Sequence, residues 1–231
     1  MAPIGLLWIP LATALLPIIA IHGTYLLSAA EGFVPWCFPY IDSCTSISAT
    51  GRHGTAYFVF KGTMIPAATL LVLYWGATGY WLRQLGDTSR TPLVIMSLGT
   101  VAAIFLVVYT VALGAAGETM QLQRRIGIVI YFGFTALCEL LLIWRLSHTR
   151  YRQALFWKIN LGICCMMLAT GLLTVVLQLV MDNYDTIEDA FEWVIALAMH
   201  IFILVTIPGW QDSGFRLTFH TGATSEKKEA P

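Results

Sequence analysis

The chain has 231 residues, of which 58% are hydrophobic and only 11% are charged, and its formal net charge is zero. A soluble domain carries about a quarter charged residues, so this composition excludes an ordinary soluble protein and predicts one that crosses a membrane several times. The sequence also contains no basic patch and no motif for nucleic acid, so we expect no nucleic-acid partner.

Long apolar stretches give the expected spans. A helix needs about 20 mostly apolar residues to cross the roughly 30 Å hydrocarbon core of a bilayer. The stretches that satisfy this requirement are Ile4–Ser28, Ala56–Leu82, Pro92–Ala116, Ile126–Leu146, Leu155–Met181 and Ala190–Pro208. Because the later connectors are short, neighbouring helices must run antiparallel. The sequence therefore predicts an all-α, polytopic membrane bundle of about six helices over residues 1–210, with a structured first extracytoplasmic loop at 29–55.

The distribution of lysine and arginine predicts which side of the membrane each connector faces, because basic residues gather on the cytoplasmic side. With a cytoplasmic N-terminus, nine of the 13 basic residues lie inside: Arg83, Arg90, Arg145, Arg150, Arg152, Lys158, Arg216, Lys227 and Lys228. The other four are Arg52, Lys61, Arg124 and Arg125. We therefore expect both termini in the cytoplasm, the loop 29–55 outside, and a flexible cytoplasmic tail over residues 211–231.

Two of the five cysteines, Cys37 and Cys44, lie in the loop that is expected to face out. In an oxidising compartment such a pair can close a small disulfide loop, and the alternative is two free thiols packed within the loop. Cys138, Cys164 and Cys165 fall inside spans, where we expect them to pack as small apolar residues. The spacing matches none of the usual thiolate metal sites, so we expect no metal and no cofactor.

Short motifs in and after this loop, and at the start of the last span, carry a family resemblance. The loop holds Pro39-Tyr40-Ile41-Asp42 and Ser46-Ile47-Ser48-Ala49-Thr50-Gly51, Tyr57-Phe58-Val59-Phe60 opens the second span, and Glu192-Trp193 begins the last one. In this order, these motifs resemble the Frag/DRAM/Sfk family. That family includes the post-GPI-attachment remodelling factor, the N-terminal domain of the Cwh-type cell-wall proteins and the damage-regulated autophagy modulators. The resemblance extends to about Trp210 and implies the same six-span fold and membrane placement.

Four polar residues lie near the outer ends of four different spans, beneath this loop: His22, Lys61, Gln178 and Glu192. Polar side chains within a bilayer usually face the bundle interior or a wet cavity. We interpret them as a pocket for a lipid headgroup in the outer leaflet, where Lys61 contacts phosphate and Glu192 pairs with Lys61 or a sugar hydroxyl. The alternative is that Lys61 and Glu192 extend to the interface and only fix their helices.

Glu139 is a deeper acid, in the cytoplasmic half of the fourth span. An ionised carboxylate at that depth needs a partner, and Asn160 on the fifth span could hydrogen-bond it. This favours an interhelical hydrogen bond that fixes packing, and the alternative is a proton or ion relay. His200, near the middle of the last span, is expected to be a packed, hydrogen-bonded histidine.

Catalytic patterns are sparse. No two of the five histidines lie four positions apart, and neither HExxH nor GxSxG occurs. Ser46 or Ser48 with His53 could form a nucleophile pair, but His53 is better interpreted as an interface residue beside Arg52. The sequence thus favours a non-catalytic integral membrane factor that acts on or with lipids of the outer leaflet, or with a membrane-protein partner. The alternatives are a lipid-remodelling enzyme of the acyltransferase or lipase type, which the remodelling branch of the family suggests, and a small-solute or proton-coupled transporter.

Overall fold

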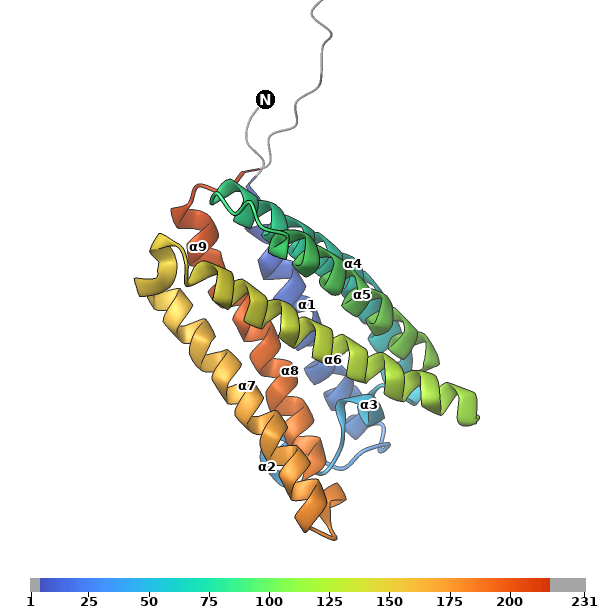
Figure 1. The fold of residues 1–231 in the computed structure, drawn as a ribbon. Helices are drawn as coiled ribbons and strands as arrows, with labels where there is room; N and C mark the ends of the chain where they lie inside the picture. The colour runs from blue at the N-terminus through green and yellow to red at the C-terminus, as the bar shows by residue number, and fades with distance from the viewer. Residues whose placement is uncertain (1–4, 217–231) are drawn as a thin grey trace, which may run out of the picture.

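A computed structural model describes residues 5–216, which fold into a bundle of helices with no strand among them (Figure 1). Six helices are long and apolar enough to cross a membrane: α1 (Trp8–Ala30), α4 (Gly54–Gln84), α5 (Thr91–Ala112), α6 (Glu118–Leu146), α7 (Leu155–Val180) and α8 (Glu188–Val205), which α9 (Ile207–Asp212) extends. Short helices occupy the connectors: α2 (Pro39–Asp42), α3 (Ile47–Thr50), η1 (Arg150–Gln153) and η2 (Tyr184–Thr186). The predicted all-α, six-span bundle is confirmed, and the chain is an integral, multi-pass membrane protein.

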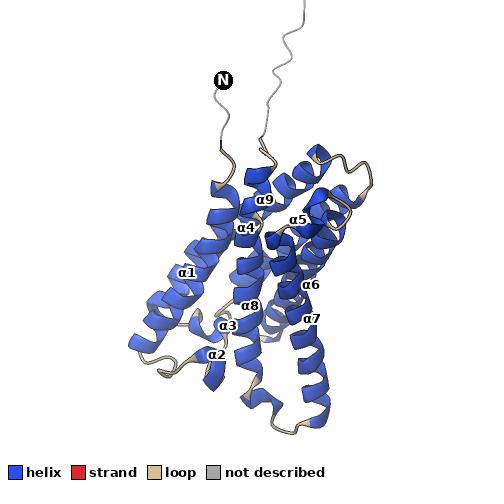
Figure 2. Cartoon of the chain, turned by 90° about the vertical axis from the view of Figure 1, so that its left-hand side faces the viewer, coloured by secondary structure: helices blue, strands red, loops and turns tan. Residues whose placement is uncertain are grey.

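The spans form a ring that follows the order of the chain, and α1 packs against α8 to close it. Both ends of the described chain lie on one face of the bundle, which we call the terminal face (Figure 2). The connectors 85–90 and 147–154 are on the same face. The opposite face, the loop face, carries residues 31–53, 113–117 and 181–187. The first loop therefore lies where the first and last spans meet.

Several helix limits differ from the expected ones, most clearly at the start of α6 and at the end of the last span. Helix α6 begins at Glu118 rather than Ile126, because the polar segment before the apolar run continues the helix beyond the length that the bilayer requires. At the other end, Gln211 belongs to α9, and the ring of Phe215 packs 4.9 Å from that of Trp210. The expected flexible tail is thus ordered as far as Arg216, and residues 217–231 lie outside the described residues.

Close helix contacts depend on small residues opposite large ones. Trp75 of α4 is fully buried against Gly99 of α5, where a Cβ atom would collide with the indole ring. Gly127 of α6 meets the backbone of Tyr109 on α5 in the same way, at 2.9 Å from a Cβ placed there. By contrast, α7 buries only Phe156, Asn160, Cys164 and Met167. The ring is therefore tight from α1 to α6 and looser at α7.

A salt bridge on the terminal face fixes the α4–α5 connector to the end of α6. Arg145 Nε lies 2.6 Å from Asp87 Oδ2, and the backbone N–H of Ser89 donates to Asp87 Oδ1 at 2.8 Å. Burial alone would raise the pKa of Asp87, but the hydrogen bonds from Arg145 and Ser89 outweigh it and hold the pKa below its ordinary value of 3.8. The folded chain therefore stabilises the ionised form of Asp87.

Candidate functional site

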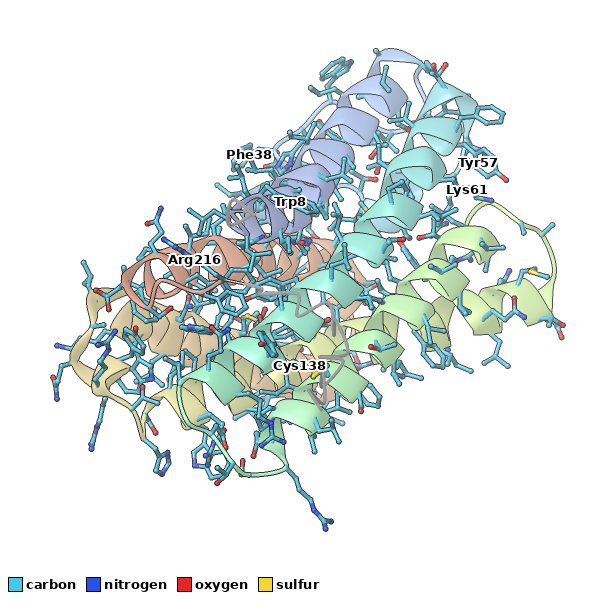
Figure 3. All side chains as sticks on the ribbon, turned by 90° about the horizontal axis from the view of Figure 1, so that it is seen from above. Trp8, Phe38, Tyr57, Lys61, Cys138 and Arg216 are labelled. Atoms are coloured by element: carbon cyan, nitrogen blue, oxygen red, sulfur yellow. A yellow bond between two sulfur atoms is a disulfide. The ribbon has the colours of Figure 1, made fainter. Side chains whose placement is uncertain are left out.

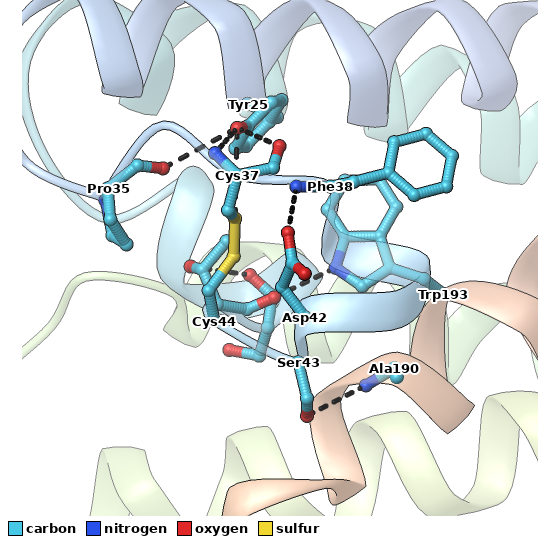
Figure 4. Close-up of a disulfide and its surroundings, with 11 residues drawn as sticks. Tyr25, Pro35, Cys37, Phe38, Asp42, Ser43, Cys44, Ala190 and Trp193 are labelled. Carbon is cyan, nitrogen blue, oxygen red and sulfur yellow. Dashed lines mark hydrogen bonds between the residues drawn. A yellow bond between two sulfur atoms is a disulfide. The ribbon is translucent and has the colours of Figure 1, made fainter.

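The first loop is folded tightly onto α1. The structure joins Cys37 and Cys44 by a disulfide, which is the bridged one of the two expected arrangements (Figure 4). The hydroxyl of Tyr25, on α1, accepts the backbone N–H of Cys37 at 2.8 Å and donates to the carbonyl of Cys37 at 2.7 Å. Tyr25 therefore hydrogen-bonds both backbone groups of Cys37 and fixes this residue to α1. The disulfide in turn fixes Cys44 to Cys37.

The same loop is held to α8 by the acid–aromatic pair. Trp193, which is fully buried, donates its indole N–H to the carbonyl of Thr45 at 2.9 Å. Glu192 Oε2 accepts the backbone N–H of Ile47, the first residue of α3, at 3.3 Å. The side chains of Glu192 and Trp193 thus both hydrogen-bond the backbone of the loop, at residues two positions apart.

His22 of α1 also binds the loop. Its Nδ1 lies 2.7 Å from the carbonyl of Ile18, so this nitrogen must donate. In the neutral ring, Nε2 then accepts the hydroxyl of Tyr40, 2.8 Å away on α2. Burial raises the pKa of Tyr40, which keeps this phenol protonated and able to donate. The ring of His22 packs edge-on against Trp193, with 5.6 Å between the centroids.

The motif serines organise α3. Ser46 Oγ accepts the backbone N–H of Ala49 at 3.1 Å, which is an N-cap, and Arg52 Nη2 donates to Ser48 Oγ at 2.6 Å. Pro39 is the first helical residue of α2, a position where proline's missing N–H costs no hydrogen bond. The serine hydroxyls are therefore engaged in holding the loop.

His53 stacks on Phe33, with 5.3 Å between the ring centroids. It forms no hydrogen bond with Ser46 or Ser48 in the described chain, so the Ser–His nucleophile pair considered from sequence is not assembled. Gly51 lies against Phe60, where an added Cβ would come within 2.7 Å of the ring. A residue with a side chain at this position would push α3 away from α4.

An open groove of about 860 Å³ lies on the loop face beside α3. Its lining consists of Glu31, Phe33, Arg52, His53, Gly54, Thr55, Tyr57, Phe58 and Gly114. We call it the loop-face groove. The carboxylate of Glu31 accepts the N–H of Thr55 at 3.0 Å, so this acid caps the first turn of α4. Arg52 is the fixed cation of the groove.

Lys61 lies one turn beyond the groove, on the α4–α5 side of the bundle (Figure 3). Its Nζ donates to the hydroxyl of Tyr57 at 2.6 Å and to the carbonyl of Val111 at 3.1 Å. The ammonium group also lies 4.1 Å from the centroid of the Tyr57 ring. Tyr57, the motif residue that opens the second span, therefore connects the lysine to the groove.

The structure does not bring together the four residues expected to form one headgroup pocket. Lys61 is bonded to α5, whereas Glu192 is bonded to Ile47 of the loop. His22 is bonded to Tyr40, and Gln178 is exposed on α7. The pairing of Lys61 with Glu192 is therefore corrected, because these side chains point toward different neighbours around the ring.

A small central cavity lies below the loop, with about 30 Å³ of free space, enough for a water molecule or two. Glu192, His200, Tyr109 and Tyr131 are among its lining residues. His200 donates from Nδ1 to the carbonyl of Ala196 at 2.6 Å, as expected for a packed histidine. The two tyrosines were not found from sequence, because a tyrosine within an apolar span gives no signal of a cavity.

Glu139 and Asn160 are both fully buried, as their positions in the spans suggested. Neither oxygen of Glu139, and neither amide atom of Asn160, makes a hydrogen bond within the described chain. The expected interhelical bond between them is therefore absent from residues 5–216. Arg145, which could have reached Glu139 only by folding back along α6, turns instead to Asp87.

Comparison with known proteins gives one match. A family model described as the Frag1/DRAM/Sfk1/Cwh43P N-terminal domain matches residues 5–213, which is nearly the whole chain. No curated protein and no solved structure matches the chain. The match contains all six spans, the disulfide loop and the Glu192–Trp193 pair that holds it. The chain therefore belongs to the Frag1/DRAM/Sfk1/Cwh43 family.

Proposed function

We propose that this chain is a non-catalytic membrane factor that binds the phosphate-bearing headgroup of a lipid at the loop-face groove. The observation that carries the proposal is an open groove lined by Arg52, with Lys61 just outside it and bonded to Tyr57 of the lining. The proposed headgroup site thus lies beside α4, whereas the sequence-based hypothesis put it beneath the first loop, among His22, Lys61, Gln178 and Glu192.

The charges in and next to the groove suit an anion. Arg52 donates one N–H to Ser48, while its Nε is buried and makes no hydrogen bond with the described residues. Arginine can bind phosphate through two parallel N–H donors, and lysine adds a point charge. Glu31 is the acid of the lining, and its carboxylate already accepts the N–H of Thr55 at the start of α4. Arg52 and Lys61 therefore make the charge of the site positive.

Exposed aromatic side chains on the loop face support a site at the membrane surface. Phe33 and Phe58 line the groove and are 49% and 73% exposed. Trp36 and Phe38, in the same loop, are 66% and 57% exposed. Aromatic residues concentrate at the level of lipid headgroups, where an apolar ring and a polar surrounding coexist. A headgroup at this level would reach Arg52 while its acyl chains remained in the bilayer.

We expect the loop face to lie outside the cytoplasm, because the excess of basic residues falls on the terminal face. Ile41 is 76% exposed on the loop face, and Thr88 is exposed on the terminal face. A cysteine introduced at Ile41 should react with an impermeant thiol reagent in intact cells. A cysteine at Thr88 should react only after the membrane is permeabilised, and the reverse result would place the groove in the cytoplasmic leaflet.

Lipid binding can be measured by native mass spectrometry of the purified full chain. The probes are phosphatidylinositol, phosphatidylethanolamine and a diacylglycerol with the same acyl chains. We expect Arg52→Gln and Lys61→Gln each to bind the phospholipids about tenfold more weakly, the loss of one charge-assisted hydrogen bond. Arg125→Gln, an exposed arginine outside the groove, is the matched control and should bind normally. Equal weakening of phospholipid binding in all three variants would refute the proposal. So would binding of the diacylglycerol by the wild-type chain as tightly as the phospholipids.

A further inference from the structure

A second cavity, of about 190 Å³, lies within the spans between α6, α7 and α8. We call it the lateral cavity. Gly133, Ala136 and Glu139 of α6, Met167 and Leu168 of α7, and Ile195 of α8 line it. It shares no lining residue with the loop-face groove, and Glu139 is its one ionisable carboxyl. The lateral cavity is therefore a separate site from the loop-face groove.

The cavity opens sideways, toward the lipid that surrounds the bundle. Gly133 and Leu168 are exposed on the outer surface of α6 and α7, Leu168 by 55%. Cys164 and Glu139, which lie deeper in the same cavity, are 3% and 0% exposed. The cavity therefore leads from the hydrocarbon region, between the two helices, toward Glu139 at its inner end.

The carboxyl group at the inner end has no hydrogen-bond partner among residues 5–216. Neither of its oxygens makes a hydrogen bond with the described residues, and both amide atoms of Asn160, one helical turn from Cys164, are also unbonded. A buried polar group without a hydrogen bond costs free energy, of the order of 1–3 kcal/mol. A ligand that bound in the lateral cavity and hydrogen-bonded these groups would remove that cost.

We propose that the lateral cavity binds an uncharged lipid through a hydroxyl group that hydrogen-bonds Glu139. A hydroxyl can donate a hydrogen bond to a carboxyl oxygen whether that group is protonated or ionised, which a methyl ether cannot do. No lysine or arginine of the described chain lines the cavity, so a phosphate would meet a carboxyl group without a compensating cation from this part of the protein. Met167, Leu168 and Ile195 supply an apolar wall for the body of the lipid.

Photolabelling of the purified full chain in phosphatidylcholine nanodiscs tests this binding. The probes are photoreactive, alkyne-tagged analogues of a sterol, a ceramide and a diacylglycerol, each compared with its own methyl ether. The three arms identify the source of the hydroxyl. We expect at least one alcohol to label a peptide of α6 or α7 several-fold more strongly than its ether. Equal labelling by every alcohol and its ether would overturn the proposal, and would leave water or no ligand beside Glu139.

One variant localises the site, and a second is its control. Gly133→Leu should fill the mouth of the cavity, and a Cβ atom at this position meets no atom within 4 Å. Gly162→Leu is the matched control, because Gly162 is an equally open glycine on α7 that does not line the cavity. Labelling should fall to the level of the ether in Gly133→Leu and remain at the wild-type level in Gly162→Leu. Undiminished labelling of Gly133→Leu would show that the lipid binds elsewhere.

Glu139→Leu separates a ligand site from a structural carboxyl group. It should abolish the preference for the alcohol over its ether. Because it removes an unbonded polar group, it should leave the unfolding temperature of the lipid-free chain unchanged or higher. A marked fall in that temperature would mean that Glu139 serves folding, and the proposal would then be wrong.

Discussion

Glu192 and Glu139 are carboxyl groups on two spans of one bundle, and they differ in what surrounds them. Glu192 meets the backbone N–H of Ile47 and belongs to a set of contacts that join the first loop to α8. Glu139 is more deeply buried, between helices that pack loosely, and its oxygens have no hydrogen bond in residues 5–216. Burial of an acid within the spans therefore has two different consequences here. Glu192 stabilises the fold through its hydrogen bond, whereas Glu139 is left without a hydrogen bond from the described residues.

The largest effect should come from the aromatic neighbour of Glu192. Trp193→Ala removes a fully buried ring and its bond to Thr45, so we expect about 3–5 kcal/mol of destabilisation. Thermal unfolding in detergent measures it. Trp193→Phe, which loses mainly the hydrogen bond, should cost only about 1 kcal/mol. A Trp193→Ala protein that unfolds at the wild-type temperature would show that α8 does not hold the loop.

The disulfide should come next. Replacing Cys37 or Cys44 by serine removes a cross-link between positions seven apart, which is expected to cost about 2–3 kcal/mol. A reducing agent should lower the unfolding temperature of the wild-type chain by a similar amount and leave the double serine variant unaffected. Were the wild-type chain insensitive to reduction, the two thiols would be free in the native protein.

The two carboxyl groups can be compared directly. Glu192→Ala leaves the N–H of Ile47 without its acceptor, so we expect a loss of about 2 kcal/mol and faster amide exchange at Ile47. Glu192→Gln keeps an acceptor oxygen and should lose less. In the same unfolding assay, Glu139→Leu should lose nothing. Equal destabilisation by Glu192→Ala and Glu139→Leu would remove the distinction between the two groups.

The smallest effect is a pH dependence on the terminal face. The pKa of Asp87 is lower in the folded chain than its ordinary value of 3.8, so its stabilising contribution is fully present above about pH 4. That contribution disappears as the pH falls through the lower, folded pKa. Asp87→Asn should therefore cost about 1 kcal/mol at neutral pH and nothing in strong acid.

Unfolding midpoints of Asp87→Asn and the wild-type chain, compared across this pH range, give the measurement. Asp212→Asn is the control, because its ion pair with Arg150 is mostly exposed and should contribute little at any pH. A gap between Asp87→Asn and the wild-type chain that persisted in strong acid would assign the stabilisation to packing instead of charge.

The spans were predictable because apolar length alone determines where a chain can cross a bilayer. Hydropathy also gives the depth of a residue, and Glu139 is buried at the level expected from its position. It does not give the direction in which a side chain points around its helix. Lys61 was therefore paired with Glu192 at a similar depth, although Lys61 faces α5 and Glu192 faces the first loop.

The candidate site was less predictable, since its main contacts involve the backbone. Glu192 and Trp193 bind the N–H of Ile47 and the carbonyl of Thr45, which carry no residue-specific pattern. The resemblance singled out the loop motifs and this pair separately. The Glu192–Trp193 pair meets the loop because α1 and α8 close the ring of helices. No local sequence pattern encodes that closure.

The bond from Trp193 to Thr45 spans 148 positions, and that from Glu192 to Ile47 spans 145. A nascent chain thus completes its first loop long before the residues that secure it have been made. During synthesis this segment must remain unsecured until the last span is in place. A chain that stopped short of its last span would leave that segment permanently unsecured, with the N–H of Ile47 and the carbonyl of Thr45 deprived of the side chains that bind them.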